Sequence, residues 1–336
     1  MAQPQTMQAC RRHILGRLLL SGALLLAASP PLLAQLYPSR PVTVIVPFAP
    51  GGGIDAVARQ LTALLAADLG QTVVVENVTG AFGTIGTQKV ARSAPDGHTL
   101  LFVVSSPLNV APLLTPSAVR YDTFKDFAPI ATVGMLPFAL VGRNDLQADS
   151  LDALVRLAKA APGKLNFGTD GTGSLLHITG ELIKQRAGID LVHVPYKAGP
   201  QVLTDIVGGQ LDLGILPVAL VQPLVRDGRV RAFGVTSSAR IASLAQVPAL
   251  SESASFEGVA LESWMGLLAP AGTPQAIVDR LAASVRKATS NAAMERQLEE
   301  RGVKPRFVSE GAFADLLRQE RKLISDVVSR TGMKPE

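Results

Sequence analysis

Two hydrophobic periodicities alternate along this chain. Short apolar runs rich in β-branched residues, such as 42–48 (VTVIVPF), predict buried strands, whereas apolar residues three or four positions apart, as in 54–68, predict amphipathic helices. From Tyr37 onward the strand-like and helix-like segments follow one another in turn. This order predicts an α/β fold in which mostly parallel sheets are flanked by helices.

The two halves of the chain repeat one plan, in which a strand is followed by a glycine-rich loop and a helix. We expect strands at 42–48, 72–76, 98–104, 131–142 with a break at Pro137, 165–167, 191–197, 211–216 and 230–236. We expect helices at 54–68, in the second half of 77–93, and at 151–161, 175–187, 201–208, 274–289, 292–301 and 310–330. Ligands of such sheets bind beyond the carboxyl ends of the strands, so a cleft between two sheets is the expected site.

The first glycine-rich loop, 48–55 (FAPGGGID), is a candidate anion site. Gly51, Gly52 and Gly53 bring backbone N–H groups to a helix N-terminus, where they are unsatisfied and carry a partial positive charge. The loop lacks the Gly-Lys-Ser/Thr of a Walker loop and the third glycine of a dinucleotide fingerprint. A tight structural turn is the alternative, and Asp55 can cap the helix or pair with Arg59.

Two further loops offer neutral donors at strand ends. Backbone amides and hydroxyls without a lysine or arginine suit a small carboxylate that must be released again. They belong to Thr169, Gly171, Thr172, Gly173 and Ser174 in the second glycine-rich loop, and to Ser105 and Ser106 after the third strand. The alternatives are a helix that is N-capped by Ser174 and simple strand-end caps, and we expect His177 to brace the second loop.

Composition indicates an exported globular protein of about two domains. The chain has 336 residues, of which 47% are apolar and 18% charged, enough for a large core. Arg11, Arg12 and Arg17 precede the apolar run 18–28, which predicts a secretory signal spanning residues 1–34 and cleaved after Ala34. Ordinary secretion is favoured, although Arg11-Arg12 leaves twin-arginine export open.

Removal of the signal changes the charge and cysteine content. Of 32 lysines and arginines, three lie in the signal, and the remaining 29 against 27 acidic residues leave a net charge of +2. A nucleic-acid partner is therefore not expected. The single cysteine, Cys10, leaves with the signal. We expect a mature periplasmic protein that is soluble, monomeric and not embedded in the membrane.

Catalytic and metal-binding motifs are not evident. His98, His177 and His193 are far apart in sequence with no acidic cluster nearby, which does not favour a metal site. No Gly-x-Ser-x-Gly motif surrounds Ser174. We expect no cofactor, no metal and no enzymatic activity.

Several long motifs resemble one family. The segments YPSRPVTVIVPFAPGGGIDAVARQL, LGQTVVVENVTGAFGTIGTQKVARSAPDGHTLLFVVSS, KLNFGTDGTGSLLHITGELIKQRAGIDLVHVPYK and SWMGLLAPAGTP are similar to the substrate-binding proteins of tripartite tricarboxylate transporters, the Bug or TctC family. With LTDIVGGQLDL and VRAFGVTSSAR they cover nearly all of 37–332 in order.

The resemblance implies a two-domain periplasmic-binding-protein fold of type II, the Venus-flytrap fold. The chain would cross between domains near 134–137 and 234–237, so that one domain combines 35–136 with 237–336 and the other holds 137–236. In this family the ligand carboxylate is held largely by backbone amides and ordered water at the two glycine loops, which here include Phe48 and Asp55 besides the residues named above.

The same resemblance implies a function. It indicates a periplasmic receptor that binds a small mono-, di- or tricarboxylate, closes its domains around it and delivers it to membrane transporter subunits. Some members carry an aspartate where this chain has Leu216, in DLGILPVAL, which favours a carboxylate with an apolar portion over an amino acid. A receptor that presents its ligand to a membrane signalling protein, or less readily an enzyme on this fold, is the alternative.

Overall fold

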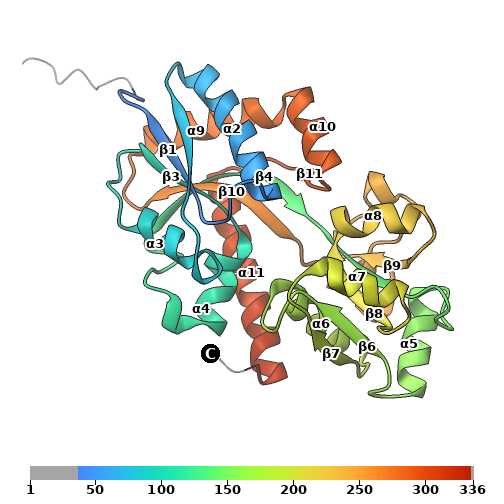
Figure 1. Ribbon diagram of the computed structural model, residues 1–336. Helices are drawn as coiled ribbons and strands as arrows, with labels where there is room; N and C mark the ends of the chain where they lie inside the picture. Colours follow the sequence, from blue (N-terminus) through green and yellow to red (C-terminus); the bar gives the residue numbers. More distant parts are fainter. Residues whose placement is uncertain (1–36, 334–336) are drawn as a thin grey trace, which may run out of the picture. The chain divides into compact units, whose positions relative to one another are not determined.

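The structure is a computed structural model that describes residues 37–333 (Figure 1). The predicted signal, residues 1–34, lies outside the described residues. Two β-sheets are flanked by helices, which confirms the predicted α/β class (Figure 1).

The first sheet has the strand order β11-β4-β10-β3-β1-β2. Its strands are β1 (Val42–Val46), β2 (Val73–Asn77), β3 (Thr99–Val104), β4 (Phe127–Leu136), β10 (Ser263–Pro270) and β11 (Lys304–Pro305). β1 pairs in parallel with both β2 and β3, whereas β10 is antiparallel to β3 and β4, and β11 is antiparallel to β4.

The second sheet has the order β7-β6-β8-β5-β9. Its strands are β5 (Phe138–Gly142), β6 (Asn166–Thr169), β7 (Val192–Pro195), β8 (Leu213–Pro217) and β9 (Arg231–Val235). β6 is parallel to β7 and β8, and β5 is antiparallel to β8 and β9. Both sheets are thus mixed rather than mostly parallel, because β10 is antiparallel to its neighbours in the first sheet and β5 is antiparallel to its neighbours in the second.

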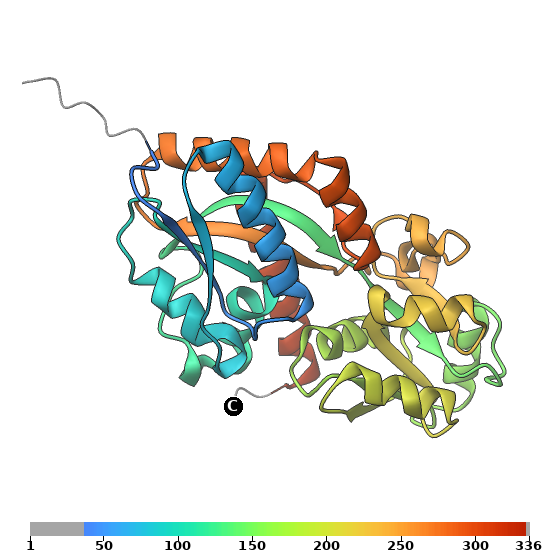
Figure 2. The ribbon, with the colours of Figure 1, turned by 45° about the horizontal axis from the view of Figure 1, so that its top comes forward.

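Helices cover both faces of each sheet (Figures 1 and 2). The helices are α2 (Gly53–Leu69), α3 (Thr84–Ala91), α4 (Ala111–Leu114), α5 (Leu151–Ala160), α6 (Leu175–Ala187), α7 (Gly199–Val207), α8 (Val218–Arg226), α9 (Gln275–Thr289), α10 (Ala292–Glu300) and α11 (Glu310–Thr331), with a π-helix, η2 (Ser106–Val110), and 3₁₀ turns such as η1 (Ala81–Gly83). α3, η2 and α11 pack on one face of the first sheet, and α2, α9 and α10 lie on the other (Figure 2). In the second sheet, α5 and α6 share one core and α7 and α8 the opposite one.

The segment between β9 and β10 packs against the second sheet. Ile241 and Leu244 belong to the core that α7 and α8 form with β5 and β9, and Phe256 and Leu261 belong to the core of α5 and α6. The return to the first sheet therefore occurs close to Ser263, where β10 begins, later than the expected crossing at 234–237. The division into two domains remains our proposal.

The last helix contacts both cores. Phe313 and Leu317, in the first half of α11, are buried against the first sheet. Ile324 and Val327, in its second half, join the core of α5, α6 and the second sheet. α11 therefore links the two sheets through one continuous helix (Figure 1, red). No helix within residues 37–333 is long and apolar enough to cross a membrane.

Candidate functional site

Three loops of the first sheet leave from the same edge. β1, β2 and β3 are parallel and in register, with Val46 beside Asn77, so the segments that follow them emerge together. These three segments lie close together at Gly83, which follows β2. A Cβ at Gly83 would lie 2.8 Å from Pro107, which follows β3, and 3.5 Å from Phe48, which follows β1. The first glycine loop and the end of β3 are therefore neighbours, as expected.

The first glycine loop is braced by Asp55. One carboxylate oxygen accepts the backbone N–H of Gly51 at 2.9 Å and Nε of Arg59 at 2.8 Å. The amide of Asn77 bridges to the other Asp55 oxygen at 2.9 Å and to the carbonyl of Phe48 at 3.0 Å. The predicted pairing with Arg59 is confirmed, whereas Asp55 does not cap α2, because it accepts the N–H of Gly51, which precedes the helix, and Gly52 at the N-cap receives no side-chain bond.

The charge of Asp55 is balanced within the loop. The Arg59 guanidinium lowers the pKa of Asp55 to about 2, with further help from the N–H of Gly51 and the amide of Asn77. Asp55 is only 2% exposed, whereas the Arg59 side chain is 53% exposed. Asp55 therefore shapes the loop, and the ion pair leaves the glycines without an uncompensated negative charge beside them.

The start of α2 is open to an anion. Gly52 occupies the N-cap and has no side chain to accept from the helix, and the first helical bond runs from the N–H of Ala56 to the carbonyl of Gly52. The N–H groups of Gly53, Ile54 and Asp55 precede that bond. A Cβ at Gly51 or Gly53 would meet nothing within 4 Å. Donors that are accessible and uncapped are the requirement for binding a carboxylate at a helix N-terminus.

The second glycine loop satisfies more of its own groups. Ser174 caps α6 by accepting the N–H of His177 at 3.1 Å, and the N–H of Gly173 donates to Nδ1 of His177 at 3.1 Å. Thr169 Oγ1 lies 2.7 Å from Nε2 of His193. The predicted brace by His177 is confirmed, and Gly171 and the exposed Thr172 remain as the less constrained part of the loop.

Two stacked imidazoles support this loop. The rings of His177 and His193 lie 3.7 Å apart at 12°. Burial lowers the pKa of each to about 4, with smaller contributions from Lys184 and, for His193, from His177. Both rings are therefore uncharged at neutral pH, so they add no positive charge to the second loop.

The segment after β3 also reaches the second loop. A Cβ at Gly173, whose φ is +72°, would lie 3.1 Å from Cδ1 of Leu114 in α4. Val110 and Leu114 belong to the same hydrophobic core as Leu175 and Leu176 of α6. The β3 end thus contacts the first glycine loop on one side and, through α4, the second loop on the other.

Ser105 faces the protein interior. It is fully buried, and its hydroxyl donates to Glu320 at 2.7 Å. Glu320 also accepts from Asn109 and, at 2.9 Å, from Nε1 of Trp264, and burial raises the pKa of this carboxyl. Ser105 thus anchors the turn, and the half-buried Ser106 begins the π-helix. The structure does not support the prediction that the Ser105 hydroxyl contacts a ligand, because this hydroxyl is buried and bonded to Glu320.

Sequence reasoning missed Glu320, although the pattern of α11 contains a signal for it. The buried positions of this helix are Phe313, Leu317, Glu320, Ile324 and Val327, spaced four, three, four and three residues apart. A glutamate within an apolar stripe indicates a buried carboxylate that needs partners.

Leu216 does not reach the loops. It is fully buried in the core that β8 forms with α7 and α8, among Val202 and Val218. Alternation along β8 directs Ile215 to the opposite core. The predicted ligand contact of Leu216 is therefore not supported, because this side chain has no accessible surface.

Comparison with known proteins decides the family. The model of the tripartite tricarboxylate transporter family receptor, TctC, matches residues 57–333. The chain belongs to this family. The resemblance seen in the sequence motifs is thereby confirmed.

Relatives of the TctC receptor cover nearly the whole chain. Protein BugT of Bordetella pertussis is 37% identical over 305 residues, which are 90% of this chain and 93% of BugT. The solved structure of Rhodopseudomonas palustris Rpa4515 with adipate has a TM-score of 0.73 and 30% identity, covering 89% of this chain and 100% of that one. MatC of the same species with bound malate has a TM-score of 0.69 and 33% identity, covering 87% and 100%.

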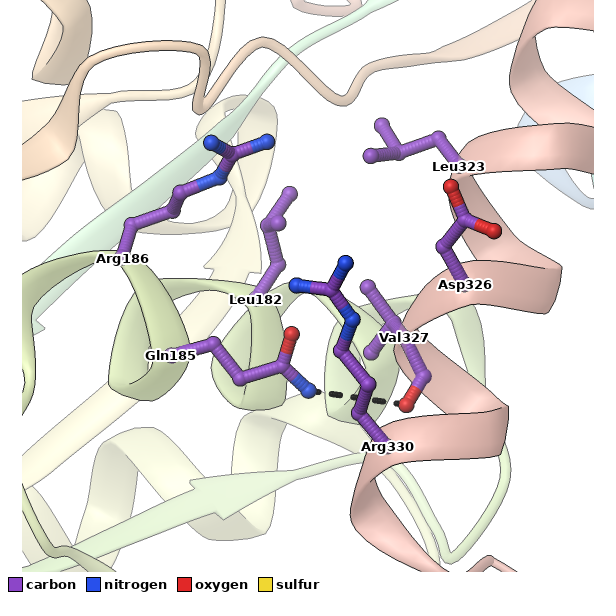
Figure 3. A pocket seen from close by; sticks show the side chains of 7 residues that line it. All are labelled: Leu182, Gln185, Arg186, Leu323, Asp326, Val327 and Arg330. Carbon is purple, nitrogen blue, oxygen red and sulfur yellow. Dashed lines mark hydrogen bonds between the residues drawn. The ribbon is translucent and has the colours of Figure 1, made fainter.

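A cavity of this TctC receptor lies away from the glycine loops. It has a volume of about 290 Å³ and is formed by α6 and α11 (Figure 3). Its lining residues are Leu182, Gln185, Arg186, Leu323, Asp326, Val327 and Arg330. None is a predicted ligand residue, so the loops and this cavity are separate features. No group of three or more His, Cys, Asp or Glu residues within 37–333 is placed to hold a metal ion.

Proposed function

We propose that this TctC receptor is a periplasmic solute-binding protein that captures a small carboxylate and delivers it to the membrane subunits of a tripartite tricarboxylate-type transporter. Family membership supports the receptor role. The adipate and malate in the two Rhodopseudomonas palustris structures support a carboxylate as the ligand class.

The observation that carries the proposal is the uncapped start of α2. In our proposal, the ligand carboxylate accepts the open N–H groups from Gly53 to Asp55, beside the Gly51–Gly53 run, where the partial positive charge of the helix favours an anion. Thr172 and the amide of Gly171 in the second loop, with Ser106 between the loops, complete the ligand contacts. Thr169 is fully buried against His193 and supports the second loop instead of contacting the ligand. None of these proposed contacts is a charged side chain. Because ion pairs with the ligand would bind it more tightly, neutral donors favour its release.

The binding step involves domain closure and no covalent chemistry. Ligand contact with loops from both sheets stabilises whichever arrangement brings those loops together. The groups named above are amides and hydroxyls that accept and donate hydrogen bonds. They hold and release the ligand unchanged.

The test is Gly53→Ala, with Gly311→Ala as the matched control. Both glycines lie in the first turn of a helix, and a Cβ at either meets nothing within 4 Å. Each substitution should leave stability unchanged or raise it by up to about 1 kcal/mol. Only Gly53→Ala places a methyl group where the ligand approaches the backbone.

We expect Gly53→Ala to weaken adipate or malate binding by about tenfold or more in calorimetry, because the added methyl group holds the carboxylate away from the N–H groups and weakens a charge-assisted hydrogen bond. Gly311→Ala should bind like the wild type. Equal affinities for wild type and Gly53→Ala would refute the binding role of the α2 start. A wild type that binds no mono-, di- or tricarboxylate would refute the proposed ligand class.

A further inference from the structure

The turn between β2 and α3 exposes an aromatic side chain on a strained backbone. Ala81 and Phe82 have φ values of +44° and +53°, in the left-handed region that non-glycine residues rarely adopt. Phe82 is 83% exposed. Such a conformation strains the backbone, and an exposed phenyl ring returns almost no burial energy. The fold therefore gains nothing from this side chain.

This turn lies beside the first glycine loop. β2 is the strand next to β1, and Asn77 is paired with Val46, so both loops leave one edge of the sheet. Gly83, adjacent to Phe82, lies against Pro47 and Phe48 of the first loop. Phe82 is thus carried on a turn that contacts the loop whose helix start is open.

The surroundings of the turn are apolar. Ile85 is 52% exposed and folds over Gly80, where a Cβ would lie 2.6 Å from its Cδ1. The only basic residues between 42 and 91 are Arg59 and Lys89. Arg59 pairs with Asp55 at 2.8 Å and Lys89 with Glu76 at 2.5 Å. On the side of the β2–α3 turn, a ligand held at Gly51–Gly53 therefore meets hydrocarbon. Because both basic residues of 42–91 are paired with acidic ones, this segment offers no unpaired cation to a second carboxylate of the ligand.

We propose that Phe82 is a specificity-determining residue that covers the apolar portion of a carboxylate bound at Gly51–Gly53. This inference rests on the proposed function and narrows its ligand class. The receptor prefers carboxylates with a hydrocarbon chain or ring, such as adipate, over short hydroxylated ones, such as malate. The apolar preference first attributed to Leu216 thus belongs to Phe82, because Leu216 is buried and Phe82 is not.

The test is Phe82→Gly, which removes the ring and also suits the left-handed backbone. The ligand-free variant should unfold at the same temperature as the wild type or higher, because the strain is relieved. Its Kd for adipate should nevertheless rise about five- to tenfold, as expected when one to two methylene equivalents lose their contact. Its Kd for malate should change by less than about twofold. If Phe82 had a purely structural role, its replacement could not raise the unfolding temperature and at the same time weaken the binding of only one of the two ligands.

Phe124→Ala is the matched control. Phe124 is also exposed, at 42%, but lies beside Arg321 of α11 rather than at the glycine loops. It should leave both affinities unchanged. Phe82→Gly with an unchanged adipate-to-malate ratio would overturn the inference and leave the proposed function intact. A wild type that binds neither acid, nor any other carboxylate, would overturn both.

Discussion

The backbone N–H of Gly51 donates to the carboxylate of Asp55 at 2.9 Å, across the turn that leads into α2. The same carboxylate pairs with Arg59 and accepts from Asn77, whose amide also holds the carbonyl of Phe48. A residue one turn into the helix therefore fixes the shape of the loop before it. The open N–H groups of Gly53 and its neighbours keep their positions only while this brace is intact.

Asp55→Asn tests the brace. Asparagine has nearly the same shape but no charge, so the ion pair with Arg59 is lost and one acceptor becomes a donor. We expect the free energy of unfolding to fall by about 1–3 kcal/mol in urea titrations, because the group is buried and charged. Carboxylate affinity should fall as well, since the loop loses its fixed geometry.

Asp315→Asn is the control for this change. Asp315 pairs with Arg318 on the surface of α11, where its side chain is 67% exposed. Its loss should change stability by less than about 0.5 kcal/mol. If Asp55→Asn were as harmless as Asp315→Asn, the brace would not determine the loop.

Glu320→Gln tests the buried link between α11 and the end of β3. The carboxylate accepts from Ser105, Asn109 and Trp264, and glutamine offers only one acceptor oxygen to these three donors. We expect the free energy of unfolding to fall by about 2–4 kcal/mol, because a buried network is left partly unsatisfied. Urea titration measures the change.

Glu300→Gln, at an exposed position near the end of α10, is the matched control and should have no measurable effect. A Glu320→Gln variant as stable as the wild type would show that the three donors find other partners. The ordering of the turn at Ser105–Ser106 would then not depend on α11.

Much of the fold could be predicted from hydrophobic periodicity, because most strands and helices bury one face in a regular way. α8 was missed, since Pro223 interrupts its short apolar pattern. β10 is buried along its whole length and shows no alternation, so nothing in it distinguishes a strand from an extended loop. The antiparallel pairing of β4, β5, β9 and β10 depends on partners distant in sequence, which local patterns do not encode.

The site could be predicted only where it is local. The pairing of Asp55 with Arg59 and the cap by Ser174 span three or four residues, and both were expected. The hydrogen bond from Ser105 to Glu320 spans 215 residues, and the sequence near Ser105 does not predict it. The exposure of Phe82 likewise depends on a backbone conformation that its sequence does not favour.

Leu216→Asp should abolish folding rather than change ligand preference. Leu216 is fully buried among Val202 and Val218, where a carboxylate would have no partner. An unpaired charge in such a core costs more than about 4 kcal/mol, so little folded protein should be recovered. Leu216→Ala should cost about 2–5 kcal/mol. Circular dichroism of both variants measures this, and a Leu216→Asp variant with native stability would show that the side chain reaches solvent.

The stacked pair of His177 and His193 predicts a loss of stability in mild acid. Burial lowers the pKa of each ring from 6.5 to about 4. Between pH 6.5 and pH 4 these histidines are therefore protonated in the unfolded chain but remain neutral in the folded chain. The contribution of these two histidines to the free energy of unfolding is fully present above pH 6.5 and is lost as the pH falls toward 4. The loss should be on the order of 3 kcal/mol for each ring.

His177→Gln separates this effect from general acid denaturation. Glutamine does not titrate, and its carbonyl oxygen can accept the N–H of Gly173 that Nδ1 of His177 now accepts. Glu181, 3.8 Å from Nε2 of His177, and Lys184 are the charged groups that face this ring, and His193 is the other titratable group in contact with it. Urea titrations from pH 7.5 to 4.5 should show a shallower decline for the variant than for the wild type. Parallel curves would mean that the second glycine loop does not sense protonation of the histidine pair, and that carboxylates elsewhere govern the acid limit of the receptor.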